Sequence, residues 1–203
     1  MPNTIYKAKS EIPTIDCALV TISIPVNGGT VYEFGFETAD QIEVEPQTEE
    51  QEAIKLIIKG KLKAQKKKHV TVTGNQITLH DNVFDVDLVI ALQGGTATYD
   101  QTTGALTGYT PPVLGSNEST NEFELNAYSA QYNAAGQIVN YEKITYPHCT
   151  GNPVAFNSQD NVFRATQYVI DSAPNNGEAP YTITYVSELP TLSEPSTATP
   201  TTP

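Results

Sequence analysis

The residues of this chain that could carry out chemistry are few and scattered. The three histidines, His69, His80 and His148, show none of the spacings that place two metal ligands on one face of an element. His148 and Cys149 are adjacent, but neighbouring residues of a strand point to opposite faces, so they make a poor metal site. No motif that would activate Cys149 as a nucleophile accompanies it. These residues therefore predict no reaction centre.

Carboxylates are abundant, but none stands in a pattern that predicts catalysis. Glu122 and Glu124 alternate with apolar residues, as on the solvated face of a strand. Asp81, Asp85 and Asp87 lack the glycine and the terminal glutamate of a calcium-binding loop. A glycosidase needs two carboxylates facing each other across a cleft, and the chain has no tryptophan to line one. We therefore expect no enzyme activity, no metal and no cofactor.

The charge distribution argues against nucleic-acid binding. The formal net charge is -12 over 203 residues, and seven of the eleven basic residues lie between Lys55 and Lys68. Binding to nucleic acid needs lysine and arginine to displace counterions along the phosphates. An acidic surface would instead let nucleic acid pass without sticking to it.

The two cysteines, Cys17 and Cys149, are too few for a disulfide framework. We expect free, partly buried thiols, with a single bridge as the alternative. The N-terminal residues lack the apolar stretch of a secretory signal, and no apolar run approaches the roughly 20 residues that span a bilayer. The sequence therefore predicts a soluble protein that folds in a reducing cytoplasm.

The elements that must position these residues are mostly strands. Residues 15–26 and 30–36 flank an Asn-Gly-Gly turn and predict a hairpin. Residues 41–45 and 53–64 form the next candidate pair, and the second of these alternates apolar residues with lysines. That alternation predicts a half-buried strand with a basic outer stripe. Further strands are expected at residues 69–73, 76–79, 96–99, 105–109, 122–132, 137–146, 162–170 and 181–186.

One helix is predicted over residues 82–93. Asn82 is a suitable N-cap, and Asp85 and Asp87 lie early, near the positive end of the helix dipole. Apolar residues recur at three- and four-residue spacing, and Gly94 is the expected terminator. Around these elements we divide the chain into an N-terminal arm (1–14), one β domain (15–187) and a disordered Pro/Ser/Thr-rich tail (188–203).

The polar, acidic segment 46–52 suits a projecting arm as well as a solvated loop. Its acidic residues and those just before it would face the lysine-bearing strand. Between identical subunits such opposite charges could set the register. We therefore expect contacts between subunits from these eight residues: Glu43, Glu45, Glu49, Glu50, Lys55, Lys59, Lys61 and Lys63.

Several segments of the chain resemble bacteriophage major tail proteins, which form the tail tube. The resemblance lies in residues 42–50, 58–65, 73–84, 163–171 and 177–185. It implies a mainly-β, sandwich- or barrel-like domain with one flanking helix and a long hairpin or loop arm. It also implies hexameric rings that stack into a hollow tube, with the tape-measure protein and terminator or baseplate proteins as partners. DNA would pass through without specific binding. The location would be the virion tail, assembled in the cytoplasm of a host bacterium.

Two other readings of the same sequence stay open. The first is a β-sandwich module or adhesin that binds a ligand such as a carbohydrate, since it would share the strands and the Thr/Pro-rich tail. The second is a hydrolase that uses Cys149 or a pair of carboxylates, which would require a deep pocket with titrating groups of shifted pKa.

Overall fold

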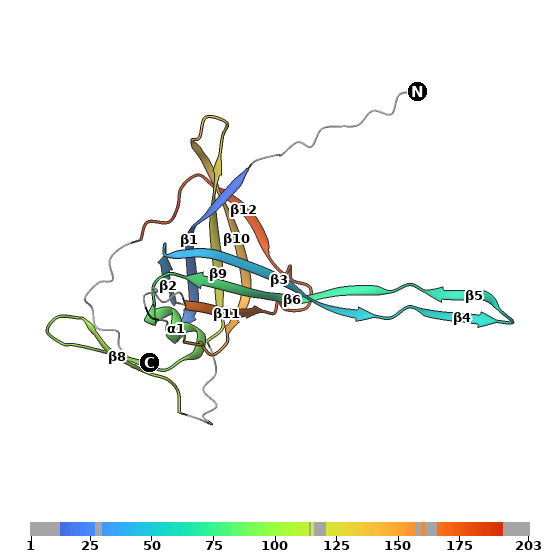
Figure 1. Ribbon diagram of the computed structural model, residues 1–203, viewed down its shortest axis with the longest axis horizontal. Coiled ribbons are helices and arrows are strands. Elements are labelled where there is room, and N and C mark those ends of the chain that lie inside the picture. The colour runs from blue at the N-terminus through green and yellow to red at the C-terminus, as the bar shows by residue number, and fades with distance from the viewer. Residues whose placement is uncertain are drawn as a thin grey trace.

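The computed structural model describes residues 13–26, 30–113, 115, 121–156, 160 and 166–192. Within these residues the fold is mainly β with one short helix, as the sequence predicts. A long two-stranded arm projects far from the body of the molecule (Figure 1). The predicted N-terminal arm lies outside the described residues up to residue 12, and so does the predicted tail from residue 193.

The described residues form twelve strands and one helix. In chain order these are β1 (Thr14–Val26), β2 (Thr30–Phe36), β3 (Ala39–Gln51), β4 (Ile54–Ile58), β5 (Lys61–Lys66), β6 (His69–Asp81), α1 (Val86–Gln93), β7 (Thr96–Tyr99), β8 (Leu106–Thr110), β9 (Phe123–Tyr132), β10 (Ile138–Gly151), β11 (Thr166–Ser172) and β12 (Thr182–Val186).

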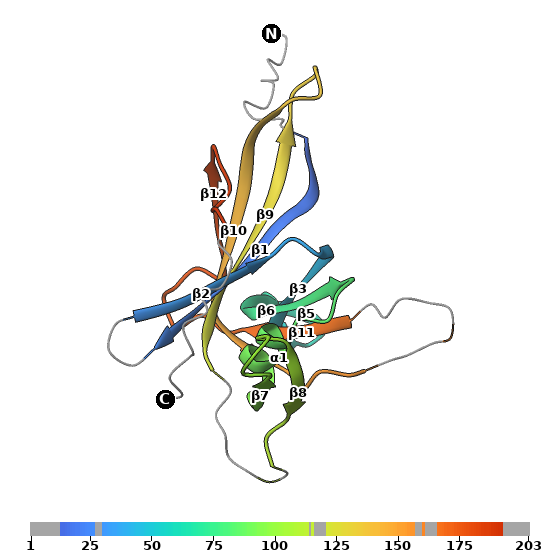
Figure 2. The ribbon, with the colours of Figure 1, turned by 90° about the vertical axis from the view of Figure 1, so that its left-hand side faces the viewer.

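Eight of the strands form one antiparallel sheet in the order β2-β1-β9-β10-β11-β6-β3, with β12 paired to β10 beside this path. The first part of β10 pairs with β9, whereas Cys149 to Gly151 pair with β11. A register shift separates Tyr146 from Cys149, and between them His148 has a positive φ of 50°. Such a bulge bends a strand. The sheet therefore folds over on itself at this point (Figure 2), which gives the expected barrel-like arrangement.

The hydrophobic core fills the space inside this fold. Val20, Ile22 and Leu125 contribute from the part of the sheet that contains β1 and β9. Ile77 and Ile170 contribute from the part that contains β6 and β11. Each of these five side chains is fully buried. Alternate residues of the strands point inward, as the period of two requires.

Helix α1 closes one end of the core with Leu88, Val89 and Leu92, all fully buried. It packs so closely on β10 that a Cβ on Gly151 would lie 2.3 Å from the Cα atom of Leu92. Only glycine fits at position 151.

The helix begins later than the sequence predicts. Its N-cap is Asp85, whose side chain accepts hydrogen bonds from the backbone N–H groups of Asp87 (2.8 Å) and Leu88 (3.2 Å). Asn82 is not the cap, because the preceding turn is held by Asp81, whose carboxylate accepts from the N–H of Val83 (3.1 Å). The predicted end is confirmed, since Gly94 has φ 75° and its N–H donates to the carbonyl of Ile90.

The predicted pairing of residues 41–45 with 53–64 is wrong. Strand β3 is longer and pairs with β6 along its whole length. Residues 53–64 are not one half-buried strand, because Lys59 and Gly60 both adopt positive φ and turn the chain back between β4 and β5. Residues 69–73 and 76–79 are not separate strands either. Gly74 lies inside β6, where a Cβ would lie 2.3 Å from the carbonyl oxygen of Ser172.

Most of the other predicted strands are present in the structure. The hairpins β1–β2, β7–β8 and β9–β10 are confirmed, although β10 continues five residues beyond the expected residue 146. The last two strands are also present. They do not pair with each other, because β11 lies between β10 and β6 and β12 lies on β10.

Candidate assembly surfaces

The arm comprises residues 47–73: the distal half of β3, the hairpin β4–β5 and the first residues of β6. Every side chain in it is exposed except that of Ala53. All the lysines among the eight predicted contact residues lie on β4–β5 or in its turn, and Glu49 and Glu50 lie on β3 nearer the body. Glu43 and Glu45 are exposed on the part of β3 that belongs to the body.

The opposite charges do not face each other within one chain as the sequence suggests. The cross-strand partners of Glu43, Glu45, Glu49 and Glu50 are uncharged residues of β6. Within the described part of the chain, the one ion pair that these eight residues form joins Glu50 to Lys68, at 2.5 Å. The predicted lysines lie farther out along the arm, on strands that pair with each other. Contacts of these eight residues between subunits stay a prediction.

A bulge gives the hairpin β4–β5 one apolar face, which the sequence alone does not reveal. Leu56 faces Ala64 across the hairpin, but the next pair is Ile57 with Leu62. Cross-strand partners share a face, and Leu62 and Ala64 share one by alternation. The bulge therefore brings Ile57 to the same face as Leu56. We call this surface the apolar arm face: Ile54, Leu56, Ile57, Leu62 and Ala64.

By register Lys66 shares this face with Ile54, whereas Lys55, Lys61 and Lys63 lie on the opposite face with Ile58. Lys55 and Lys63 alternate with its members, and Lys59 and Lys61 flank the turn. The exposed fractions of Ile54, Ile57 and Leu62 are 67%, 60% and 55%. A lone two-stranded hairpin is marginally stable in water, so this amphipathic arm is suited to packing against a partner.

A second surface consists of the two free edges of the four-stranded segment β1-β9-β10-β12. One edge belongs to β1 and the other to β12. Among the described residues β12 pairs only with β10, so its other edge carries unpaired backbone groups. In the first part of β1, Thr14, Ile15 and Leu19 pair with β9, and no strand among the described residues pairs with its opposite edge, because β2 pairs only from Val20 onward. Unpaired edges of this kind are templates for another strand.

The two free edges lie at the same level of the sheet. Thr184 of β12 lies opposite Lys143 of β10, which lies opposite Tyr128 of β9, which lies opposite Leu19 of β1. All four strands are antiparallel to their neighbours. The edge strands β1 and β12 therefore run in opposite directions.

The face of these strands that points away from the core carries polar and charged side chains beside the buried Leu19 and Tyr128. By register it carries Ser23, Glu33, Glu124, Lys143 and Thr184. Part of it forms an open depression of about 520 Å³, lined among others by three glutamates, Lys143 and His148. Leu192, near the end of the described chain, lies beside Gly35 at one margin of this face. The depression is shallow and acidic rather than a deep apolar pocket.

His148 ties three elements together beside this depression. Its Nδ1 atom contacts the carboxylate of Glu122, and its Nε2 atom lies 2.9 Å from Glu178 and 2.8 Å from the Asn175 amide. The hydrogen bond to Glu122 is the main cause that raises the pKa of His148 above its ordinary 6.5. The backbone N–H of Asn175 and the proximity of His148 lower the pKa of Glu178. The arrangement is an ion-pair cluster that holds the β11–β12 connection against β10.

The remaining titratable groups do not gather into a reaction centre in the part of the chain that the structure describes. Cys17 and Cys149 are both free, as expected. Burial raises the pKa of the Cys17 thiol to about 11 and that of Cys149 to about 12. Reactive thiols have a lowered pKa. The described residues contain no group of three His, Cys, Asp or Glu placed to hold a metal ion.

The helix of the described chain is too short to cross a membrane.

Comparison with known proteins gives a structural match but no sequence match. No protein-family model matches the chain, and no curated protein sequence matches it. The fold is similar to that of a chain in a structure described as "Cryo-EM structure of the anti-feeding prophage (AFP) baseplate, 6-fold symmetrised", with a TM-score of 0.40 and 9% sequence identity. The match covers 86% of this chain and 97% of the other.

Proposed function

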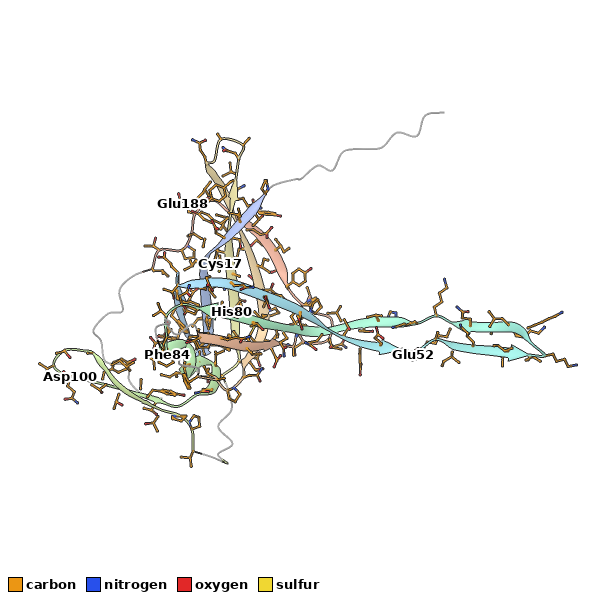
Figure 3. The ribbon with its side chains drawn as sticks, in the orientation of Figure 1. Cys17, Glu52, His80, Phe84, Asp100 and Glu188 are labelled. Atoms are coloured by element: carbon orange, nitrogen blue, oxygen red, sulfur yellow. The ribbon has the colours of Figure 1, made fainter. Side chains whose placement is uncertain are left out.

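We propose that this protein is a structural subunit that assembles with copies of itself into stacked rings, forming a tube of the phage-tail type. The observation that carries the proposal is the arm. It projects from the body, exposes an apolar face bordered by lysines, and has no covering partner among the described residues of its own chain (Figure 3). Exposed apolar surface of this kind marks a protein–protein contact.

The free edges of the sheet support a ring. If β12 of one copy lies beside the first half of β1 of the next, the sheet continues from copy to copy. Because β1 and β12 run in opposite directions, a simple rotation brings them together as antiparallel neighbours. Such a head-to-tail contact closes into a ring when the rotation closes. The resemblance to tail tube proteins sets the expected number at six copies.

The polar face of this sheet is suited to line the bore. The opposite face carries the core, with β3, β6, β11 and α1 packed over it. A closed ring has more room on its outside, so the bulky side would lie there. Glu33 and Glu124 would then face the bore together with Lys143 and uncharged polar side chains, so this set of groups carries a net negative charge. Carboxylates repel phosphates, which favours passage of DNA without specific binding.

The charge distribution supports self-association through the arm. Residues 54–68 hold seven lysines and no acidic residue. The other residues hold four basic and 23 acidic groups, a formal charge of −19. The arm of one copy is therefore attracted to the body of another. Following the resemblance, the further partners would be a tape-measure protein and terminator or baseplate proteins, in the tail of a virion assembled in a bacterial cytoplasm.

The proposal is tested by reversing two charges of the arm. The double variant Lys61→Glu/Lys63→Glu should fold as a monomer with the circular dichroism of the wild type, because both side chains are exposed. It should fail to form the rings or tubes that electron microscopy would show for the wild type. Lys143→Glu is the control, since this lysine lies on the polar sheet face, away from the arm. Normal tubes from the double variant would contradict the proposed role of the arm.

A further inference from the structure

Three large side chains on one face of the edge strand β12 are exposed. Ile183 and Tyr185 belong to the strand, and Tyr181 directly precedes it. They alternate along the chain, so they point to the same side. Their exposed fractions are 46% for Tyr181, 46% for Ile183 and 59% for Tyr185. We call these three residues the β12 strip.

The β12 strip lies on the core side of the sheet. Ile183 lies opposite Ile144 of β10, which packs against the hydrophobic core, and cross-strand partners share a face. The ring of Tyr181 lies 6.2 Å from that of the buried Tyr146, centroid to centroid. The strip therefore continues the core outward to a place where its side chains stay exposed. Exposed apolar surface of this kind marks a contact with another molecule.

The margins of the β12 strip and of the apolar arm face carry opposite charges. Tyr185 lies opposite Glu142 of β10, so this carboxylate borders the strip on the same face. On the arm, Lys66 lies opposite Ile54 and borders the apolar arm face in the same way. Neither Glu142 nor Lys66 forms an ion pair among the described residues. The two surfaces therefore match in apolar character and in charge.

We propose that the apolar arm face of one copy docks on the β12 strip of a second copy, with Lys66 facing Glu142. This inference rests on the proposed self-assembly and names the surface that receives the arm. The contact removes apolar side chains of both copies from water, which is the main driving force of association. The pairing of opposite charges at the margin fixes the orientation of the arm on the strip.

The arm of the same chain cannot cover the β12 strip. At the base of the arm, Asn75 donates a hydrogen bond to the carbonyl of Pro180 (2.9 Å), directly before Tyr181. The chain from Asn75 out to Lys66 spans roughly 30 Å at the rise of a strand. The pairing of β3 with β6 keeps this part of the arm extended, and the arm projects away from the sheet (Figure 1). The occupant must therefore come from another copy.

The position of the β12 strip keeps a docked arm out of the proposed bore. The strip lies on the core side of the sheet, whereas Glu124 and Lys143 lie on the face that would line the bore. The contact is made through side chains, so the free backbone edge of β12 remains available for β1 of the next copy. One strand can thus serve both the ring and the arm.

The first test is photo-crosslinking in assembled protein. Benzoylphenylalanine replaces Tyr185, which is exposed enough to accept it. Labelled protein is assembled with nitrogen-15 protein, so that mass spectrometry recognises crosslinks between copies. Crosslinks to residues 54–66 of another copy are expected. Assemblies that crosslink only elsewhere, including strip to strip, would overturn the docking while leaving self-assembly intact.

A failure of assembly is also informative. If the labelled protein does not assemble although the wild type does, the label moves to Leu62 on the arm, and crosslinks to residues 181–185 of another copy are then required. If the wild type itself does not assemble, the proposed function fails, and this inference fails with it.

A charge exchange gives a second readout that does not depend on the label. Lys66→Glu and Glu142→Lys should each raise the concentration needed for assembly, by up to about fivefold, because each brings like charges together. The two substitutions combined should restore the wild-type concentration. Lys66→Glu combined with Glu124→Lys is the matched control, since Glu124 lies on the opposite face of the sheet, and it should restore nothing. Equal behaviour of the two combinations would contradict the docking.

Discussion

Replacing Gly151 by alanine should destabilise the protein through the contact between β10 and α1. The added Cβ would lie 2.3 Å from the Cα atom of Leu92, and 2.5 Å from its Cβ and its carbonyl oxygen. These atoms belong to or adjoin the helix backbone, so no flexible side-chain end can move aside. Overpacking of a core typically costs about 1–3 kcal/mol. We expect a loss near the upper limit, because the helix itself must shift.

For a chain of this size, each kcal/mol lowers Tm by about 2–4 °C. The variant should therefore melt roughly 6–12 °C below the wild type in thermal unfolding followed by circular dichroism. Gly108→Ala is the matched control. There the only described neighbour within 4 Å of an added Cβ is the hydroxyl oxygen of Thr98, at 3.2 Å, in the exposed β7–β8 hairpin. If the two variants have the same Tm, the glycine at position 151 is not needed for the close packing of α1 on β10.

Three further predictions concern single side chains. Asp85→Ala removes the N-cap of α1 and should lower the free energy of unfolding by about 1 kcal/mol in urea denaturation; an unchanged midpoint would contradict the capping role. His148→Asn keeps a residue that tolerates positive φ but removes the charged partner of Glu122. Because the folded-state pKa of His148 is raised, its stabilisation is complete below 6.5 and is lost as pH rises through the raised value. The Tm difference between wild type and variant should therefore shrink as pH rises above 6.5, and a constant difference would refute this. Cys149, with a pKa of about 12 and no exposed surface, should react with iodoacetamide more slowly than Cys17 until the protein unfolds; faster labelling of Cys149 in the native protein would contradict its burial.

Local signals predicted most of the elements. The turn residues between β9 and β10 and the Gly94 terminator of α1 act through the backbone of a few neighbouring residues, so the sequence reveals them directly. The start of α1 was misplaced because Asn82 and Asp85 are both good caps. The choice between them depends on Asp81, which is fully buried in the tertiary fold.

The error at residues 53–64 has a different cause. Alternating apolar and lysine residues predict one buried face, but the pattern does not say what buries it. In the described chain nothing covers Leu56 or Leu62, and Lys59-Gly60 divides the segment into two strands. The bulge that brings Ile57 beside Leu56 depends on a one-residue offset between β4 and β5, which no composition signal marks.

The surfaces proposed for assembly were only partly predictable. The sequence indicates the lysines of the arm because they are clustered between Lys55 and Lys68. Its acidic residues, however, pair with β6, and this long-range register cannot be deduced from charge.

Electron microscopy of the purified protein at increasing concentration, with its mass followed by light scattering, tests the account most directly. We expect rings or hollow tubes of uniform diameter and sixfold symmetry, and a mass that rises in steps with concentration. A protein that stays monomeric up to its solubility limit, with neither rings nor tubes on the grid, would contradict the proposed self-assembly.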